Sequence, residues 1–344
     1  MIENSVTNIL LITGKKSFIS SGAKLFLSKI IKKYKVVIVS DFSANPKIKD
    51  LIKIRKKINW NLIDCVIGIG GGSVIDMSKL LMFYKDSINI DLSKNSFISN
   101  IPLVAIPTTA GSGSEATHFS VIYDNDNLKH SVANQNLLPA LTILNYNLSY
   151  NLSPYMKAVS GLDAFAQAIE SYWSVQANEE SRKYSLQALE LIYNNLKKSV
   201  QENDLDAHKM MVKGSNLAGK AINIAKTTAC HALSYYFTSN FGIAHGHAVS
   251  LTLGRVYEFN YNKAHNLSDA KALKIFENLN YILKINNSPY DSLNNFICNL
   301  GIEIDLQKLN IKIDYNQLFK NVNLERMKNN IFPLKKQDIK NIIL

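Results

Sequence analysis

The sequence lacks several features that would place it in a specialised class of protein. Its three cysteines, Cys65, Cys230 and Cys298, form no Cys-x-x-Cys pair, and so sparse a set predicts no disulfide framework and fits a reducing compartment. No apolar run approaches the roughly 18 residues that a membrane helix needs, and the run at residues 9–12 is too short for a signal peptide. Internal repeats and low-complexity linkers are also missing. We therefore expect a packed, cytoplasmic globular protein that spans no membrane.

Charge is abundant, and the basic residues outnumber the acidic ones. The 344 residues include 39 Lys and Arg against 27 Asp and Glu, a formal net charge of +12 at pH 7. Such an excess raises the question of nucleic-acid binding. The basic residues come in short separate groups, however, such as Lys15-Lys16, Arg55-Lys56-Lys57 and Lys335-Lys336. We interpret them as solvated surface that could also attract an anionic substrate or cofactor, and we predict no nucleic-acid partner.

Short apolar runs that alternate with amphipathic stretches predict an α/β fold for the first part of the chain. The expected strands are residues 9–12, 35–40, 65–69, 102–106 and 141–144, and the expected helices are 22–31, 48–58 and 73–84. Buried strands that alternate with helices indicate a parallel, Rossmann-like sheet. After Ser153-Pro154 the spacing becomes helical, most clearly in 181–196, 207–225, 269–283 and 336–344. We expect an α/β domain over residues 1–150, an all-α domain over 151–344, and a ligand site in the cleft between them.

A glycine-rich segment, Gly68-Ile69-Gly70-Gly71-Gly72-Ser73, follows the third expected strand and begins a helix. Consecutive glycines remove side chains where the backbone must approach an anion, and the helix start offers unpaired N–H groups and a positive dipole end. The pattern is typical of a pyrophosphate cradle, although a tight strand-to-helix turn explains it equally well. It differs from the Gly-x-Gly-x-x-Gly fingerprint of other dinucleotide sites.

Together with Asp76, this segment resembles the Gly-Gly-Gly-Ser-x-x-Asp element of iron-containing alcohol dehydrogenases, dehydroquinate synthases and glycerol dehydrogenases. A second element, Ile-Pro-Thr-Thr-Ala-Gly-Ser-Gly-Ser-Glu at residues 106–115, is similar to the signature of the iron-containing alcohol dehydrogenase family. The resemblance covers nearly the whole chain and implies a dehydroquinate synthase-like fold with a nicotinamide cofactor on the first domain. The residues that it assigns to the cofactor are Gly70, Gly71, Gly72, Ser73, Asp76, Thr108, Thr109, Ser112 and Lys129.

The end of the first expected strand bears on the choice between the two nicotinamide cofactors. Family members that prefer NAD often carry an acidic residue there, whereas this chain has Gly14-Lys15-Lys16-Ser17. Gly14 leaves room for a 2′-phosphate, and the Lys and Ser side chains could bind it. We predict NADPH or NADH as the cofactor and favour NADPH, with an ordinary surface turn as the alternative.

Two further segments correspond to the metal-binding elements of the family. Residues 161–170, Gly-Leu-Asp-Ala-Phe-Ala-Gln-Ala-Ile-Glu, resemble its Gly-x-Asp-Ala-x-x-His-Ala-x-Glu element, in which Asp163 is retained but Gln167 replaces His. Being four residues apart, these two share one helix face. His231 and His245 have the fourteen-residue spacing of the other two family ligands. The resemblance thus implies a metal site of Asp163, Gln167, His231 and His245, with Fe(II) favoured and Zn(II) or Mn(II) as alternatives.

The same resemblance implies metal-dependent, NAD(P)H-linked reduction of a small aldehyde to a primary alcohol. Residues 161–175, 226–235 and 241–248 look most like the phosphonoacetaldehyde reductase branch, including Gln167 and Tyr235, where other members have His. We therefore expect an anionic aldehyde, with reduction of phosphonoacetaldehyde to 2-hydroxyethylphosphonate as the first hypothesis.

Within that hypothesis, Lys226, Thr227 and Thr228 are candidates to bind the phosphonate, and Tyr235 is a candidate proton donor. The alternative substrates are sulfoacetaldehyde and a simple alkyl aldehyde. The alternative activities are those of a glycerol dehydrogenase, of a dehydroquinate synthase-like enzyme and, because an amide is a weak ligand, of a metal-free reductase. A homodimer formed through the first domain is the family-based expectation.

Overall fold

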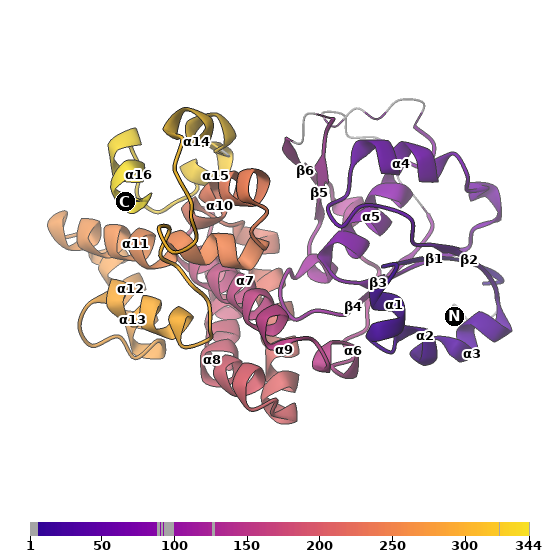
Figure 1. The fold of residues 1–344 in the computed structure, drawn as a ribbon, viewed down its shortest axis with the longest axis horizontal. Coiled ribbons are helices and arrows are strands. Elements are labelled where there is room, and N and C mark those ends of the chain that lie inside the picture. The colour runs from indigo at the N-terminus through magenta and orange to yellow at the C-terminus, as the bar shows by residue number, and fades with distance from the viewer. Residues whose placement is uncertain are drawn as a thin grey trace. The chain divides into compact units, whose positions relative to one another are not determined.

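The computed structural model describes residues 6–87, 90, 92, 100–125, 128–322 and 324–343. The chain divides into two compact units, Met1–Leu152 and Ser153–Leu344. The first unit combines strands with helices, and the second is helical in its described residues (Figure 1). This pattern confirms the predicted fold class.

A parallel sheet forms the centre of the first unit. Its strands are β1 (Asn8–Thr13), β2 (Lys35–Val39), β3 (Cys65–Gly70), β4 (Leu103–Pro107) and β7 (Leu141–Thr142). They lie in the order β2-β1-β3-β4-β7, and every neighbouring pair is parallel. The carboxyl ends of all these strands therefore meet at one edge of the sheet, where ligands bind in open α/β sheets.

Helices cover both faces of this sheet because the strands are apolar on both faces. Leu10 and Ile12 of β1 belong to one core, and Ile9 and Leu11 to the other. The first core includes α4 (Ile48–Arg55) and α5 (Gly72–Phe83), and the second includes α1 (Ser17–Ser20), α2 (Ala23–Phe26) and α3 (Ser28–Lys33). The helix predicted at 22–31 is thus interrupted, because Leu27 adopts a turn conformation with φ −88° and ψ 5°.

A small antiparallel sheet of β5 (Phe119–Tyr123) and β6 (Lys129–Ala133) was not predicted. Both strands are short; β5 is mostly apolar and β6 mostly polar, and neither alternates regularly between buried apolar and exposed polar residues, so the sequence carries little periodic signal. It lies against α5, where the Ser120 hydroxyl donates to the carbonyl of Asp76 at 3.0 Å. Shorter elements of this unit are the 3-10 turns η1 (Trp60–Leu62), η2 (Ser114–Ala116) and η3 (Gln135–Leu137), and α6 (Asn147–Tyr150).

The second unit is built around one central helix, α7 (Pro154–Trp173). Ser153 caps its start by accepting from the backbone N–H of Met156, and Pro154 takes the first helical position. Every residue from Gly161 to Trp173 is buried. The other helices are α8 (Glu179–Gln201), α9 (Leu205–Ala225), α10 (Ala229–Phe241), α11 (His245–Asn266), α12 (Ala270–Ile282), α13 (Pro289–Cys298), α14 (Tyr315–Asn321), α15 (Leu324–Lys328) and α16 (Lys336–Ile343). A carboxylate on so buried a helix must find partners inside the protein.

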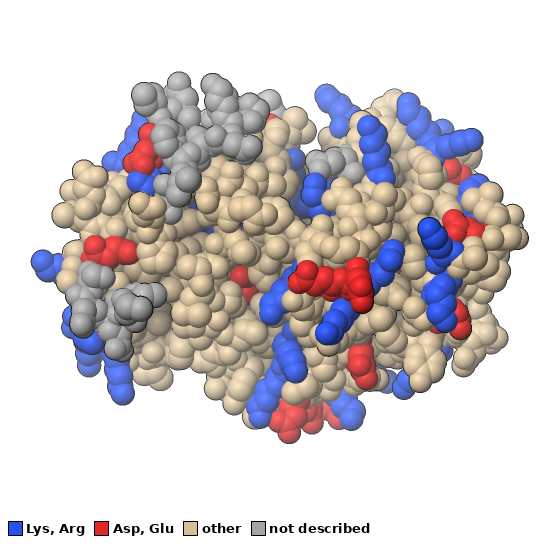
Figure 2. Space-filling model, turned by 180° about the vertical axis from the view of Figure 1, so that it is seen from behind, with Lys and Arg blue, Asp and Glu red and all other residues tan. Residues whose placement is uncertain are grey.

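The charges on one face of the molecule agree with the interpretation of the basic residues as solvated surface. On the face shown in Figure 2, the Lys and Arg side chains occur in separate groups, with acidic groups between some of them. Among the described residues, no helix combines the length and the apolar character needed to cross a bilayer. The three cysteines are free; Cys65 and Cys230 are buried and Cys298 is exposed.

Candidate metal centre and nucleotide cradle

Three of the four predicted metal ligands meet inside the second unit. Asp163 comes from α7, His231 from α10 and His245 from the start of α11, and one ligand atom from each lies within 4.8 Å of the others. The Asp163 Oδ1 is 3.2 Å from the Nε2 of His231 and 4.0 Å from the Nε2 of His245. Asp163 and His231 are buried, and His245 is half-buried.

Gly246 explains how α11 comes close enough to α7 for His245 to reach this cluster. A Cβ at this position would lie 1.8 Å from the carbonyl oxygen of Val159 and 3.0 Å from the Cβ of Asp163. Only glycine therefore permits this approach of the two helices. Gly246, next to the candidate ligand His245, thus allows the helix packing that brings His245 to Asp163.

A transition-metal ion fits the donor atoms of this cluster. One carboxylate and two imidazoles are common ligands of Fe(II) and Zn(II). Burial alone would lower the pKa of His231, but the Glu170 carboxylate and the hydrogen bond to Asp163 outweigh it and raise that pKa to about 9. The ring thus binds a proton between two carboxylates, and a divalent cation would replace that proton.

Gln167, the fourth predicted ligand, lies beside Asp163 on the same face of α7. Its Nε2 donates to the Asp163 Oδ1 at 3.1 Å, and its side chain is buried. In this position the amide orients the carboxylate. Whether its oxygen also binds a metal stays a prediction.

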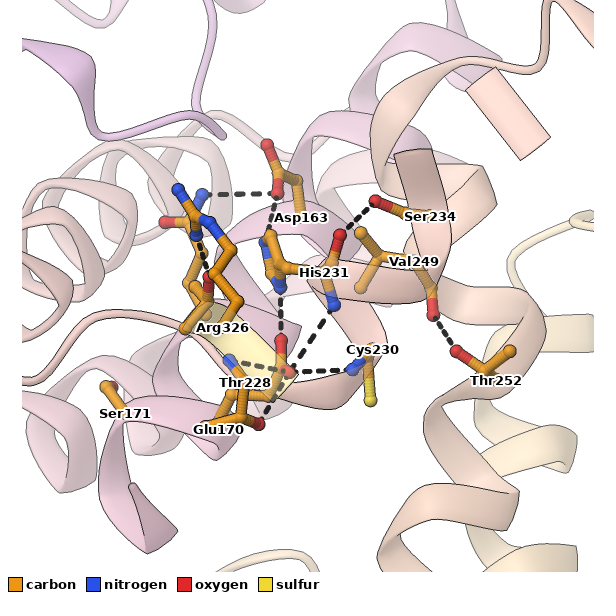
Figure 3. Close-up of polar contacts among 12 residues, drawn as sticks. Asp163, Glu170, Ser171, Thr228, Cys230, His231, Ser234, Val249, Thr252 and Arg326 are labelled. Carbon is orange, nitrogen blue, oxygen red and sulfur yellow. Dashed lines mark hydrogen bonds and ion pairs between the residues drawn. The ribbon is translucent and has the colours of Figure 1, made fainter. Parts of the chain in front are cut away.

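Glu170 is the important residue of this centre that the sequence interpretation missed. Its side chain is fully buried, and its Oε2 accepts a hydrogen bond from the Nδ1 of His231 (Figure 3). Its Oε1 accepts from the backbone N–H groups of Thr228 at 3.0 Å and Cys230 at 2.9 Å, and from the Thr228 hydroxyl at 2.7 Å. The carboxylate thereby fixes the ring so that Nε2 faces Asp163. Glu170 ends the quoted motif, and a lone acid between apolar helix residues was the available signal.

These contacts also hold the carboxylates in their charged form. Burial alone would raise the pKa of Asp163 and of Glu170. The two histidines outweigh this effect at Asp163, and His231 outweighs it at Glu170, so that both pKa values are lowered. The centre is therefore a compensated group of buried charges.

Tyr235, the predicted proton donor, is buried in α10 one turn after His231. The guanidinium carbon of Arg326 lies 5.9 Å from the centre of its ring. Lys226, the other predicted catalytic residue, is half-buried and ends α9 with a positive φ of 59°.

The two threonines that follow Lys226 have internal partners. The Thr228 hydroxyl donates to Glu170 and accepts from the indole N–H of Trp173 at 2.9 Å. The Thr227 hydroxyl accepts from Arg326. Both side chains are buried. The Thr228 hydroxyl therefore supports the candidate metal centre, and phosphonate binding by these threonines stays a prediction.

In the first unit, the predicted cofactor residues gather at the carboxyl edge of the sheet. The glycine-rich turn joins β3 to α5, and the Thr108 N–H donates to the Gly70 carbonyl at 2.9 Å. A Cβ on Gly72 would lie 2.7 Å from the Ser112 Oγ, and one on Gly71 would lie 3.4 Å from the Thr109 methyl carbon. Ser73 follows within the first turn of α5. The two family elements of this unit therefore pack directly against each other.

The turn after β1 lies at the same edge. A Cβ on Gly14 would come within 3.7 Å of the Val74 side chain on α5, and Lys15 and Lys16 lead from there into α1, which begins at Ser17. Lys129 has a different place, at the start of β6 opposite Tyr123, whose N–H donates to the Pro46 carbonyl.

Two charged residues of α5 brace the loop that follows β4. Asp76 accepts from the Ser114 hydroxyl at 2.5 Å and from the Val121 N–H at 3.1 Å. Burial raises its pKa. These bonds brace the loop, and the cofactor role that the resemblance assigns to Asp76 stays a prediction.

Lys79, which the sequence interpretation missed, is fully buried one turn further along α5. Its Nζ donates to the carbonyls of Ser114 at 2.5 Å, Thr117 at 2.8 Å and Phe119 at 2.9 Å. Burial lowers its pKa to about 8, against the opposing effect of Asp76 and Glu115. A lysine directly before the apolar run at residues 80–83 was the signal that could have identified it.

Comparisons with known proteins match both parts of the chain to the same family. Residues 2–146 match the family described as iron-containing alcohol dehydrogenase, and residues 157–344 match the C-terminal part of the Fe-containing alcohol dehydrogenase family. The 4-hydroxybutyrate dehydrogenase of Clostridium kluyveri is 30% identical over 95% of this chain and 92% of its own length. The phosphonoacetaldehyde reductase of Streptomyces viridochromogenes is 31% identical over 65% of this chain and 60% of its own length.

Among solved structures, the sulfoacetaldehyde reductase of Bifidobacterium kashiwanohense, in complex with NAD+, matches 98% of this chain and 90% of its own chain. Its TM-score is 0.87 and its sequence identity 26%. Several curated relatives, the phosphonoacetaldehyde reductase included, are matched over only 56% to 60% of their own length.

Proposed function

The chain belongs to the iron-containing alcohol dehydrogenase family of oxidoreductases that act on alcohols, and we propose that it reduces a small anionic aldehyde to a primary alcohol. The main support is the buried cluster of Asp163, His231 and His245, which lies within the matched residues 157–344. These three side chains would hold the metal, Fe(II) first, and Gln167 is a candidate fourth ligand. When bound, the metal supplies Lewis-acid polarisation of a carbonyl and the nicotinamide cofactor supplies a hydride.

The protein's own groups would prepare the centre for this reaction. Glu170 and Thr228 keep the His231 ring oriented toward Asp163, and this arrangement supports ligand geometry that exists before binding. Tyr235 is our candidate for the proton that the alcohol oxygen requires, because its phenol is buried one turn from His231. Lys226 is the candidate for a further cation near the substrate.

The anionic character of the substrate is supported by the relatives. The three relatives named above carry names that combine an alcohol or aldehyde with a carboxylate, a phosphonate or a sulfonate. We propose phosphonoacetaldehyde as the first candidate, on the local resemblance around Gln167 and Tyr235. Sulfoacetaldehyde is the second, because its sulfonate is also a tetrahedral anion.

For the cofactor we propose NADPH or NADH, bound at the carboxyl edge of the sheet in the first unit. The glycine-rich turn at the start of α5 supports the pyrophosphate site. Lys15 and Lys16 favour NADPH, whereas the related sulfoacetaldehyde reductase was solved with NAD+. Both cofactors therefore belong in the test.

We also propose a homodimer formed through the first unit. β2 is an edge strand of the sheet, and its Val37 and Ile38 side chains are 51% and 48% exposed. An apolar edge of this kind favours pairing with another strand, and a second copy of the chain would cover it.

The test is a panel of phosphonoacetaldehyde, sulfoacetaldehyde and propionaldehyde, each with NADPH and NADH, in the presence of Fe(II), Zn(II) or a chelator. We expect the anionic aldehydes to be reduced fastest and all activity to stop after exhaustive chelation. His245→Ala should lower kcat/KM by on the order of 10³-fold, because a ligand of a Lewis acid worth several kcal/mol is lost. Its cofactor affinity should stay unchanged.

The matched control is His265→Ala, which removes an exposed histidine from the same helix and should keep full activity. Turnover that survives chelation, or normal turnover in His245→Ala, would show a metal-free reductase. Activity confined to the oxidation of glycerol would show the alternative polyol dehydrogenase.

A further inference from the structure

We propose that Arg326 binds the anionic group of the aldehyde and thereby selects anionic over neutral substrates. This inference rests on the proposed function and adds the residue that recognises the phosphonate, sulfonate or carboxylate. The threonines expected in that role are engaged inside the unit, and the cation that meets one of them comes from α15.

Arg326 lies alongside the segment that carries His231. Its NH1 donates to the hydroxyl of Thr227, four residues before the histidine, and its guanidinium carbon is 5.9 Å from the ring of Tyr235, four residues after it. These two contacts place the guanidinium against the turn before α10 and against the turn of α10 that follows His231. A short aldehyde with an anion close to its carbonyl could reach both Arg326 and the ligands of the candidate metal centre.

The backbone that carries Arg326 is fixed to the same segment. Asn329, at the end of α15, is buried, and its Nδ2 donates to the carbonyls of Ala225 at 2.8 Å and Thr227 at 3.1 Å. Its Oδ1 accepts from the Ser174 hydroxyl at 3.0 Å. Because the turn before α10 and the end of α15 are held together, the guanidinium is positioned before a substrate arrives.

The chemistry of the side chain suits a tetrahedral anion or a carboxylate. A guanidinium offers five N–H donors in a planar fork that can bind two oxygens at once. Its contacts with the Thr227 hydroxyl and the Tyr235 ring hold the guanidinium against the segment that carries His231. A divalent ion would offset the carboxylates of Asp163 and Glu170, so the charge of Arg326 would favour an anion beside the centre.

The experiment compares Arg326→Met and Arg326→Lys with the wild type on phosphonoacetaldehyde, sulfoacetaldehyde and propionaldehyde. Arg326→Met keeps an apolar chain but removes the charge and the N–H groups. We expect kcat/KM for the two anionic aldehydes to fall by on the order of 10²-fold, mainly through KM, because a charged hydrogen-bonding pair is lost. The value for propionaldehyde should change by less than about threefold. Arg326→Lys should recover part of the loss, since it restores the charge without the fork.

Arg182→Met is the matched control. Arg182 also donates to an oxygen, the Tyr172 carbonyl at 3.2 Å, and its guanidinium carbon also lies 6.0 Å from a tyrosine ring centre, that of Tyr172. Its replacement removes the same types of contact elsewhere in the unit and should leave the preference for anionic aldehydes unchanged. Thermal unfolding of all variants shows whether each still folds.

A second readout does not depend on turnover. Calorimetric titration of the metal-loaded protein with methylphosphonate should give binding to the wild type and to Arg182→Met, and binding weaker by on the order of 10²-fold to Arg326→Met. Equal losses on neutral and anionic aldehydes, or unchanged methylphosphonate binding, would overturn the role of Arg326 alone. A wild type that prefers propionaldehyde would instead overturn the proposed substrate class.

Discussion

The two units use charged side chains in opposite ways. In the second unit, the groups of the candidate centre are themselves side chains, with Asp163 and Glu170 on either side of His231. In the first unit, the turn at Gly71 is bare backbone, and the charged side chains lie behind it. Lys79, for example, binds three backbone carbonyls of the following loop and segment. The candidate metal centre is made of charged side chains, whereas the proposed cofactor site is a backbone turn whose glycines lack side chains.

This difference has an energetic basis. The buried charges of the second unit compensate one another, so that removing one partner leaves another charge alone in the interior. Lys79 instead donates to the dipoles of three backbone carbonyls, and burial lowers its pKa to about 8. Stability and ligand binding in the second unit should therefore be most sensitive to the removal of a charged side chain. In the first unit they should be most sensitive to the loss of the hydrogen bonds of Lys79 and to atoms added at the glycines.

The largest effect should come from Glu170→Gln. The amide cannot accept from both His231 and the N–H groups of Thr228 and Cys230, so one donor loses its partner or meets another donor. We expect metal affinity to fall about 10- to 100-fold and the protein to lose about 3 kcal/mol of stability. Equilibrium metal binding and urea unfolding measure the two changes.

Two comparisons make this result specific. Glu190→Gln removes an exposed carboxylate from α8 and should leave both quantities unchanged. The affinity of Glu170→Gln for NAD(P)H should also match that of the wild type, because the proposed cofactor site lies in the other unit. A metal affinity within about threefold of the wild type would contradict the positioning role of Glu170.

The sequence was sufficient for the parts of this molecule that depend on periodicity and on motifs. All five strands of the parallel sheet were predicted, because each lies in a short apolar run of the sequence. The runs of β1, β3 and β4 are largely buried, whereas β2 and β7 are partly exposed. Three predicted ligands, Asp163, His231 and His245, do come together. Family spacing carries that information even though α7, α10 and α11 are separate in the sequence.

The parts that were missed depend on tertiary contacts. Glu170 and Lys79 have no local pattern that reveals their partners, since these lie between 35 and 61 residues away along the chain. The Thr228 hydroxyl could not be assigned to Glu170 without knowing that α10 begins against α7. The hairpin of β5 and β6 was missed for a different reason, because β5 has its polar Ser120 buried and apolar Phe119 and Val121 partly exposed, and β6 is mostly polar, so neither strand shows the expected periodic pattern.

The next effect is a pH dependence that belongs to the first unit. The folded pKa of Lys79 is about 8 and the reference value 10.5. The unfolded chain therefore binds the extra proton between these values, and stability rises with pH across this window. Compared with Lys79→Met, which has no such group, the wild type should gain about 2 kcal/mol between pH 8 and pH 10.

Urea unfolding at several pH values measures this difference. Trp60 reports on the first unit in a Trp173→Phe background, which both proteins share. As a control, the difference between the wild type and Lys49→Met, at an exposed position of α4, should stay constant over the same pH range. A difference between wild type and Lys79→Met that stays flat or declines with pH would show that burial does not lower the pKa of Lys79 in the folded protein.

The smallest effect, about tenfold in cofactor affinity or ~1.4 kcal/mol, should come from single methyl groups in the glycine turn. Gly72→Ala places a Cβ 2.9 Å from the Ser112 Cβ, so the loop must move, and both stability and NAD(P)H binding should suffer. Gly71 has φ −72°, which alanine adopts, and its Cβ would meet Thr109 at 3.4 Å. Gly71→Ala should therefore fold normally and still bind NAD(P)H about tenfold more weakly, because the methyl occupies the path of the pyrophosphate. Fluorescence titration with NAD(P)H measures this affinity. A Gly71→Ala variant with wild-type affinity would show that the glycine-rich segment is only a tight strand-to-helix turn and does not bind the pyrophosphate.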